Sequence, residues 1–95
     1  MKKYEIMFIV NPTLEEASIN NVKEEVKKLI EKNDGKVIDS KDMGQRDLAY
    51  EIKKHKKGYY HLYTIEGTTE TIDAFNHMSN VNTNIIRSLV VKIED

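Results

Sequence analysis

Residues 44–66 constrain the fold of this chain more than any other stretch, because they contain two strand-like segments joined by a short basic connection. From residue 48 to residue 52, apolar residues alternate with polar or small ones, which is the period of a half-buried strand. Residues 59–65 are rich in aromatic and β-branched side chains, as a central strand would be. The lysine-rich connection, 53–57, must face water or an anionic partner. The stretch therefore predicts a β-hairpin with a basic tip.

The N-terminal third predicts a strand followed by an amphipathic helix. Residues 3–10 form an apolar strand, which ends at Pro12 because proline lacks a backbone donor. Thr13 and Glu16 have the spacing of a capping box, which predicts that the helix starts there. Apolar residues then recur every three or four positions to about residue 32. We expect Gly35 to end this helix in the left-handed conformation.

The remaining segments complete a recognisable order of elements. A strand begins at residue 36, and its continuity past Gly44 stays open, since a glycine there fits a bulge or a bend. After the hairpin, a threonine hydroxyl can cap a short helix over about 70–79, and 85–93 forms a last strand. The order β-α-β-β-α-β in one domain, residues 1–95, predicts an α+β, ferredoxin-like two-layer sandwich. Its four-stranded antiparallel sheet has the first and third strands in the centre and both helices on one face.

Composition restricts the compartment and the class of partner. The chain is 39% hydrophobic and 33% charged, as a globular protein is, and its longest apolar run, residues 6–10, is too short to cross a bilayer. The N-terminal residues do not have the pattern of a signal peptide. The chain has no cysteine, which excludes disulfides and thiolate metal sites and fits the cytoplasm. We therefore expect no membrane association.

The net charge is −1, whereas a protein that holds nucleic acid by bulk electrostatics is usually strongly basic. Any contact with RNA must therefore come from a few well-placed cations, or be shared with a more basic partner.

The sheet face that the helices leave uncovered is expected to be apolar. Met7 and Ile9 lie on that side of the first strand and, if Glu66 marks the same side of the third, so do Tyr60 and Leu62. An exposed apolar patch of this kind usually marks an interaction surface. The pattern predicts a protein partner.

An enzyme is not indicated by the sequence. His55, His61 and His77 fall on the connection, a strand and a helix, without the spacing of metal ligands. Nucleophile-elbow, phosphate-loop and dinucleotide motifs do not occur. Acylphosphatase shares the expected fold, but residues 11–14 do not match its phosphate-binding loop. We therefore predict no catalytic residue, cofactor, metal or small-molecule substrate.

An RNA-recognition motif, which binds single-stranded RNA, is the alternative with the same element order. Residues 57–63 partly match its K-G-F/Y-G/A-F-V-x-F/Y element. Tyr60 replaces the small residue, however, and His61 replaces a stacking aromatic. A stacking platform would expose two aromatics on the open face, whereas protein docking would cover Tyr60 and Leu62.

Three separated motifs carry a resemblance to a known family. They are G-x-R-x-L-A-Y-x-I-x-K followed by G-Y-Y (44–60), K-Y-E-x-M-F-I-V-N-P (3–12) and I-I-R-S-L-V-V-K (85–92). Together they resemble the bacterial small-subunit ribosomal protein six family over nearly the whole chain. One departure is Glu51, where that family usually has proline.

The resemblance implies a structural, cytoplasmic component of the small ribosomal subunit. Members of that family bind the central domain of the small-subunit ribosomal RNA together with a basic partner, small-subunit ribosomal protein eighteen, during assembly. The candidate RNA-binding residues are Lys2, Lys3, Tyr4, Arg87 and Lys92, and the candidate partner-binding residues are Arg46, Leu48, Tyr50, Tyr60 and Leu62. We expect the first and last strands to be parallel neighbours, which would put Arg87 beside Lys2 and Lys3 and leave Lys92 toward the opposite end.

Overall fold

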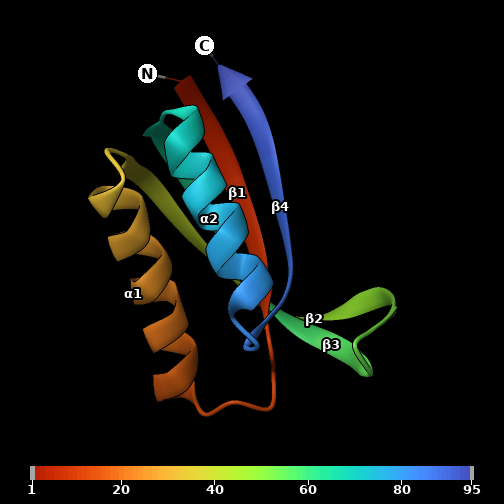
Figure 1. Ribbon diagram of the computed structural model, residues 1–95. Coiled ribbons are helices and arrows are strands. Elements are labelled where there is room, and N and C mark those ends of the chain that lie inside the picture. The colour runs from red at the N-terminus through yellow and green to blue at the C-terminus, as the bar shows by residue number, and fades with distance from the viewer. Residues whose placement is uncertain (1, 95) are drawn as a thin grey trace.

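The predicted two-layer fold is confirmed by a computed structural model, which describes residues 2–94 (Figure 1). Its elements are β1 (Lys2–Val10), α1 (Glu16–Lys32), β2 (Lys36–Ile52), β3 (His55–Gly67), α2 (Thr69–Val81) and β4 (Ile85–Glu94). The strands form one antiparallel sheet in the order β2-β3-β1-β4, and both helices cover the same face. Among the described residues, no helix is long and apolar enough to span a bilayer.

The core lies between the sheet and the two helices. Tyr4, Ile6, Phe8 and Val10 alternate along β1 and are all buried on the helix side. The apolar stripe of α1 and Phe75 of α2 pack onto them. This alternation leaves the intervening β1 side chains on the other side of the sheet. That side is called the open face below.

The direction of β4 corrects one expectation. β4 pairs with β1 antiparallel, so that Tyr4 lies opposite Lys92 and Ile9 lies opposite Arg87. A helical crossover returns the chain in the direction of the strand before it, so β4 runs with β3 and against β1. Lys92, and not Arg87, is therefore the cation beside the start of β1.

Both ends of α1 also differ from expectation. The helix begins at Glu16 without a side-chain cap, and Thr13 donates from its amide and hydroxyl to the side chain of Asn11, at 2.9 and 2.7 Å. Asp34 adopts the left-handed conformation, with φ 64°, in place of Gly35. Gly35 is required for space, because a Cβ there would lie 2.7 Å from a methyl carbon of Ile30.

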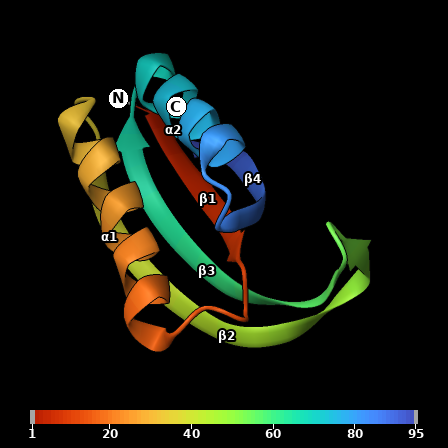
Figure 2. The same ribbon diagram turned by 60° about the horizontal axis from the view of Figure 1, so that its bottom comes forward.

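The hairpin of β2 and β3 is longer than the rest of the sheet. β2 is continuous to Ile52, with a register shift at Gly44, whose φ of 74° suits glycine. Beyond this point the two strands curve out of the body of the protein, and the projection lies on the far side from α1 (Figures 1 and 2). We call residues 44–58 the hairpin arm.

The base of the hairpin arm is packed against β1 through a glycine. Gly58 is buried, and a Cβ added there would lie 2.2 Å from Cγ2 of Ile9. This close approach explains why Ile9 is only 4% exposed although it lies on the open face. The path of the hairpin arm thus depends on the absence of a side chain at residue 58.

We predict that Gly58→Ala destabilises the protein by about 1–3 kcal/mol, since the added methyl must displace Ile9. Chemical denaturation monitored by circular dichroism measures this change. Gly44→Asn is the matched control, because asparagine tolerates a positive φ and no atom lies within 4 Å of a Cβ at that position. Equal effects of the two substitutions would contradict the packing argument.

Candidate functional site

The open face carries a band of apolar side chains that crosses three strands. Leu62 of β3, Met7 of β1 and Leu89 of β4 lie opposite one another in the register, and Tyr60 and Ile9 form the next pair. Leu89 is 53% exposed. Val91, one position further along the open face of β4, is 45% exposed. The expected apolar character of this face is therefore confirmed.

The hairpin arm curls across one end of the open face and encloses a groove of about 200 Å³. One wall comes from the arm, through Leu48, Tyr50 and Ile52, and the opposite wall comes from Arg87 and Leu89 of β4. Met7, Ile9 and Tyr60 lie between them. The two edge strands of the sheet thus meet across the open face, around a cleft that is mostly apolar.

A polar contact closes this groove at its rim. Arg87 donates a hydrogen bond from Nη1 to the hydroxyl of Tyr50, and its guanidinium lies 5.8 Å from the centre of the same ring. Tyr50 nevertheless remains 61% exposed. The pair therefore leaves both an aromatic surface and a cation exposed at the mouth of the groove.

Four of the five candidate partner-binding residues meet at this surface. Leu48, Tyr50 and Tyr60 line the groove, and Leu62 lies beside it on the open face. Arg46 lies on the hairpin arm, where its Nε donates to the carbonyl of Met43 at 3.2 Å. Sequence reasoning missed Ile52 and the pairing of Tyr50 with Arg87. No pattern in the sequence showed that the arm would bend toward β4.

The candidate RNA-binding residues divide between two ends of the sheet. Lys2 and Lys3 lie at the start of β1, and Lys92 pairs with their neighbour Tyr4. We call Lys2, Lys3 and Lys92 the terminal cluster, since β1 begins and β4 ends there (Figure 1). Arg87 lies in the groove at the other end. Tyr4 is 7% exposed and belongs to the core, so its ring has no free face for a base.

The aromatic residues of β3 do not form a stacking platform. Tyr60 lies on the open face, whereas Tyr59, His61 and Tyr63 pair with the core positions of β1 on the helix side. Within residues 2–94, the open face of β3 thus presents one aromatic side chain. An RNA-recognition motif requires more than one.

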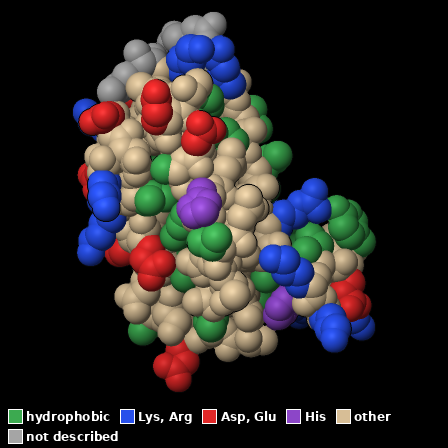
Figure 3. Space-filling model, viewed as in Figure 1, with side chains coloured by type: hydrophobic (Ala, Val, Ile, Leu, Met, Phe, Trp, Pro, Cys, Tyr) green, Lys and Arg blue, Asp and Glu red, His purple; other side chains and the backbone are tan. Residues whose placement is uncertain are grey.

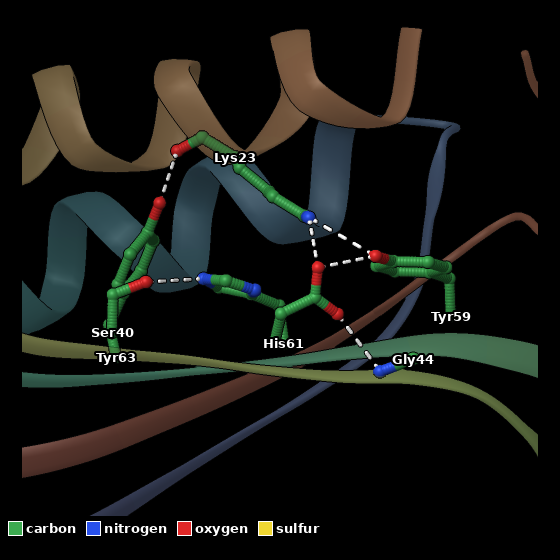
Figure 4. A network of polar contacts seen from close by, with 7 residues as sticks. Lys23, Ser40, Gly44, Tyr59, His61 and Tyr63 are labelled. Carbon is green, nitrogen blue, oxygen red and sulfur yellow. Dashed lines mark hydrogen bonds and ion pairs between the residues drawn. The ribbon is translucent and has the colours of Figure 1, made fainter. Parts of the chain in front are cut away.

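The helix side of β2 and β3 holds a polar network instead (Figure 4). Lys23 of α1 donates to the carboxylate of Asp42 at 2.9 Å and to the hydroxyl of Tyr59 at 3.3 Å. Tyr59 also donates to Asp42, at 2.5 Å. The bond from Tyr59, with a smaller contribution from Lys23, lowers the pKa of Asp42 to about 2. Because the network joins α1 to the edge strand, its role is to hold β2 in place.

Two buried side chains extend this network into the core. His61 is 4% exposed, and its Nε2 lies 2.9 Å from the hydroxyl of Ser40. Burial, together with the Lys23 cation, lowers the pKa of His61, so the ring is neutral near pH 7. Tyr63 donates to the carbonyl of Lys23 at 3.0 Å, and burial raises its pKa to about 12. Within the described part of the chain, no group of three or more His, Asp or Glu side chains is placed to hold a metal ion.

A four-stranded sheet that is covered by helices on one face, and that carries an apolar band and groove on the other, is typical of a small binding protein. Comparison with known proteins identifies which kind. The sequence model of the family described as Ribosomal protein S6 matches residues 3–92. The chain therefore belongs to the ribosomal protein S6 family, whose members are non-enzymatic, structural proteins of the small ribosomal subunit in the bacterial cytoplasm.

Relatives and a solved structure agree with this assignment. The chain is 42% identical to the small ribosomal subunit protein bS6 of Phytoplasma mali, over 99% of this chain and 100% of that protein. It is 39% identical to the bS6 of Shouchella clausii, over 99% of both chains. The crystal structure of 30S ribosomal protein S6 from Thermotoga maritima superposes with a TM-score of 0.92 at 33% identity, covering 97% of this chain and 87% of that one.

We predict that Asp42→Asn removes an acid-sensitive contribution to stability. The folded pKa of about 2 lies below the ordinary value of 3.8, so ionised Asp42 stabilises the fold above about pH 4, and this is lost as the pH falls toward 2. The side chain of Asp42 is 48% exposed, so we expect a loss of only about 1 kcal/mol at pH 7. The difference between variant and parent should vanish near pH 2.

Urea denaturation at pH 7, 4 and 2.5 measures both effects. Asp39→Asn, at an exposed position of the same strand, is the control and should leave the pH profile unchanged. A constant difference between Asp42→Asn and the parent at all three pH values would contradict the assigned role of the carboxylate.

Proposed function

We propose that this chain docks small-subunit ribosomal protein eighteen on its open face, and that the pair binds the central domain of the small-subunit ribosomal RNA during assembly. The observation that carries the proposal is the apolar band with its groove. A face that met only water would be largely polar, as is usual for the free side of an antiparallel sheet. Here Leu89, Val91 and Ile93 of β4 are each at least 45% exposed.

The shape of the surface supports docking of another polypeptide. The groove is large enough for one or two apolar side chains, and the flanking band formed by Met7, Leu62 and Leu89 extends the contact over the sheet. Burial of such groups on association is favourable by about 25 cal/mol per Å² of apolar surface. In the proposed complex, the groove would hold one or two side chains of the partner, and the apolar band would supply most of the buried contact area.

The charge balance supports a shared RNA site. With fifteen lysines and arginines against sixteen acidic residues, the chain alone lacks the excess of cations that non-specific binding needs. The terminal cluster brings Lys2, Lys3 and Lys92 to one end of β1 and β4. In the proposed complex this cluster contacts phosphates, while the basic partner supplies most of the electrostatic attraction.

A mixing experiment tests the function. Binding of labelled central-domain RNA is measured with this chain alone, with the partner alone and with both. We expect the pair to bind at least about tenfold more tightly than either protein, a gain of about 1.4 kcal/mol. Tight and specific binding by this chain alone would overturn the proposal, because it would place the whole RNA site on a nearly neutral protein.

Leu62→Asp tests the docking face in the same assay. A carboxylate in the centre of an apolar interface is costly, so we expect heterodimer affinity to fall by about 2–4 kcal/mol, roughly 30- to 1000-fold. The control is Val81→Asp, which places the same charge at an exposed apolar position of α2, away from the open face. Circular dichroism shows whether both variants fold. Equal heterodimer affinity of the two folded variants would show that the partner binds elsewhere.

The terminal cluster is tested by its effect on the salt dependence of binding. For the pair, we expect Lys2→Ala with Lys92→Ala to weaken RNA binding and to reduce the slope of log K against log salt concentration by about 1.5, since each phosphate contact contributes about 0.7–0.9. Lys27→Ala with Lys28→Ala, on α1, removes the same charge elsewhere. If both double variants change the slope equally, only net charge matters and the cluster is not a contact site.

A further inference from the structure

Positive charge is concentrated on the hairpin arm. Residues 44–58 contain five lysines and arginines against two acidic residues, a formal charge of +3. The other 80 residues contain ten against fourteen, a formal charge of −4. In the space-filling view, lysine and arginine side chains appear at several places on the projecting arm (Figure 3). The net charge of −1 is therefore the sum of a basic hairpin arm and an acidic body.

The lysines at the tip are exposed to solvent. Lys53, Lys54, Lys56 and Lys57 are all exposed. Within residues 2–94, none of the four forms an ion pair with an acidic side chain. Acidic Asp47 and Glu51 on the same arm are also exposed. Four ammonium groups thus face solvent together, on a segment that stands out from the body of the molecule.

The turn at the tip contains lysines at two positions where the backbone conformation favours asparagine or glycine. Lys53 and Lys54 form the two-residue turn between Ile52 and His55, and both have positive φ, 48° and 69°. A two-residue hairpin turn of this kind favours Asn-Gly, and an ordinary side chain in the left-handed region costs about 1 kcal/mol. Local conformation therefore does not account for lysine at either position. Residues with strained backbone angles cluster at functional sites.

The hairpin arm has two different sides. The side chains of Leu48, Tyr50 and Ile52 face the groove, where the proposed protein partner docks. The turn between β2 and β3 lies at the end of the projecting ribbon (Figure 2), and its lysines are exposed. An occupied groove would therefore leave the tip lysines accessible to a second, anionic ligand.

We propose that the tip of the hairpin arm, Lys53, Lys54, Lys56 and Lys57, is a phosphate-binding site for the ribosomal RNA backbone, separate from the terminal cluster. Four flexible ammonium groups suit phosphates, which lysine contacts as a point charge, and carry no base specificity. The site needs only the presence of this chain in the small subunit. It does not depend on which protein occupies the open face.

Directed cleavage of RNA tests this site without reference to the protein partner. The chain has no cysteine, so Lys54→Cys gives a single attachment point for iron–EDTA at the tip, and Lys28→Cys gives a matched point on α1. Each labelled protein is assembled into small subunits, and hydroxyl radicals are generated. We expect ribosomal RNA to be cut at discrete positions from residue 54, and more strongly than from residue 28. No cleavage from residue 54, or equal cleavage from both, overturns the proposal.

Charge removal provides the energetic test, on the pair or on assembled subunits. Changing Lys53, Lys54, Lys56 and Lys57 to glutamine should reduce the salt slope of RNA binding by about 3, if the slope loses about 0.7–0.9 for each contact. The control changes four lysines of the body to glutamine, namely Lys27, Lys28, Lys32 and Lys36. An equal loss of slope in both variants overturns the proposal. Failure of the pair to form, by contrast, would count against the proposed partner and leave the cleavage result to decide this site.

A turn variant separates the contact from the fold. Lys53→Asn with Lys54→Gly should raise the unfolding temperature, because the new residues suit the positive φ values, while lowering RNA affinity. Higher stability with unchanged RNA affinity would show that the two turn lysines do not contact phosphate, and would overturn their part in the site.

Discussion

Two helices can cover only one side of a four-stranded sheet. The features of the open face follow because no helix remains to cover the apolar side chains on that side. The chain has 95 residues, and α1 and α2 both lie on the side where Phe8 and Phe75 form the core. The opposite side keeps Met7, Leu62 and Leu89 in one row of the register. Covering these groups is favourable for any polypeptide that fits them, and the ribosomal protein S6 family is built into a particle where such polypeptides are close by.

The polar network on the helix side determines where the hairpin arm begins. Lys23, Asp42 and Tyr59 tie the middle of β2 to α1, so this edge strand stays with the body up to residue 42. Asp42 also accepts from the amide of Gly44 at 2.9 Å, at the position where the register shifts. The strand is thus held on one side of the shift and free to curve on the other. The ion pair between Lys23 and Asp42 therefore helps to set the point from which the hairpin arm curves away from the body.

Local pattern was sufficient for most of the fold. The alternation in β1 predicted both that strand and its buried side, because the helices cover one face of it, and the alternation in residues 48–52 predicted a strand. The local pattern did not predict the start of α1, where two hydrogen-bonding arrangements of Thr13 were possible. The hydroxyl of Thr13 could cap a helix or bond to Asn11, and it bonds to Asn11. The direction of β4 followed from topology rather than composition, and the rule for crossovers gives it once β3 and α2 are placed in order.

The groove could not be predicted, because it depends on a bend. Parity along the first and third strands predicted that Met7, Tyr60 and Leu62 lie on the open face. The contact of Tyr50 with Arg87, however, joins opposite edges of the sheet. That contact is possible because Gly58 has no side chain that would hold the arm away from Ile9. The spacing of apolar residues in the sequence does not reveal such a packing requirement.

The net charge of −1 indicated that any RNA contact comes from a few local cations, but an average over the chain could not show where on the surface those cations gather. Their location matters for assembly on RNA. An acidic body repels phosphate on average, so a projecting basic tip would orient the protein as it approaches RNA in the proposed assembly. The same hairpin also forms one wall of the apolar groove. In the proposed assembly, the wall of the groove contacts the protein partner and the tip contacts RNA, so this one hairpin would link the positions of the two partners.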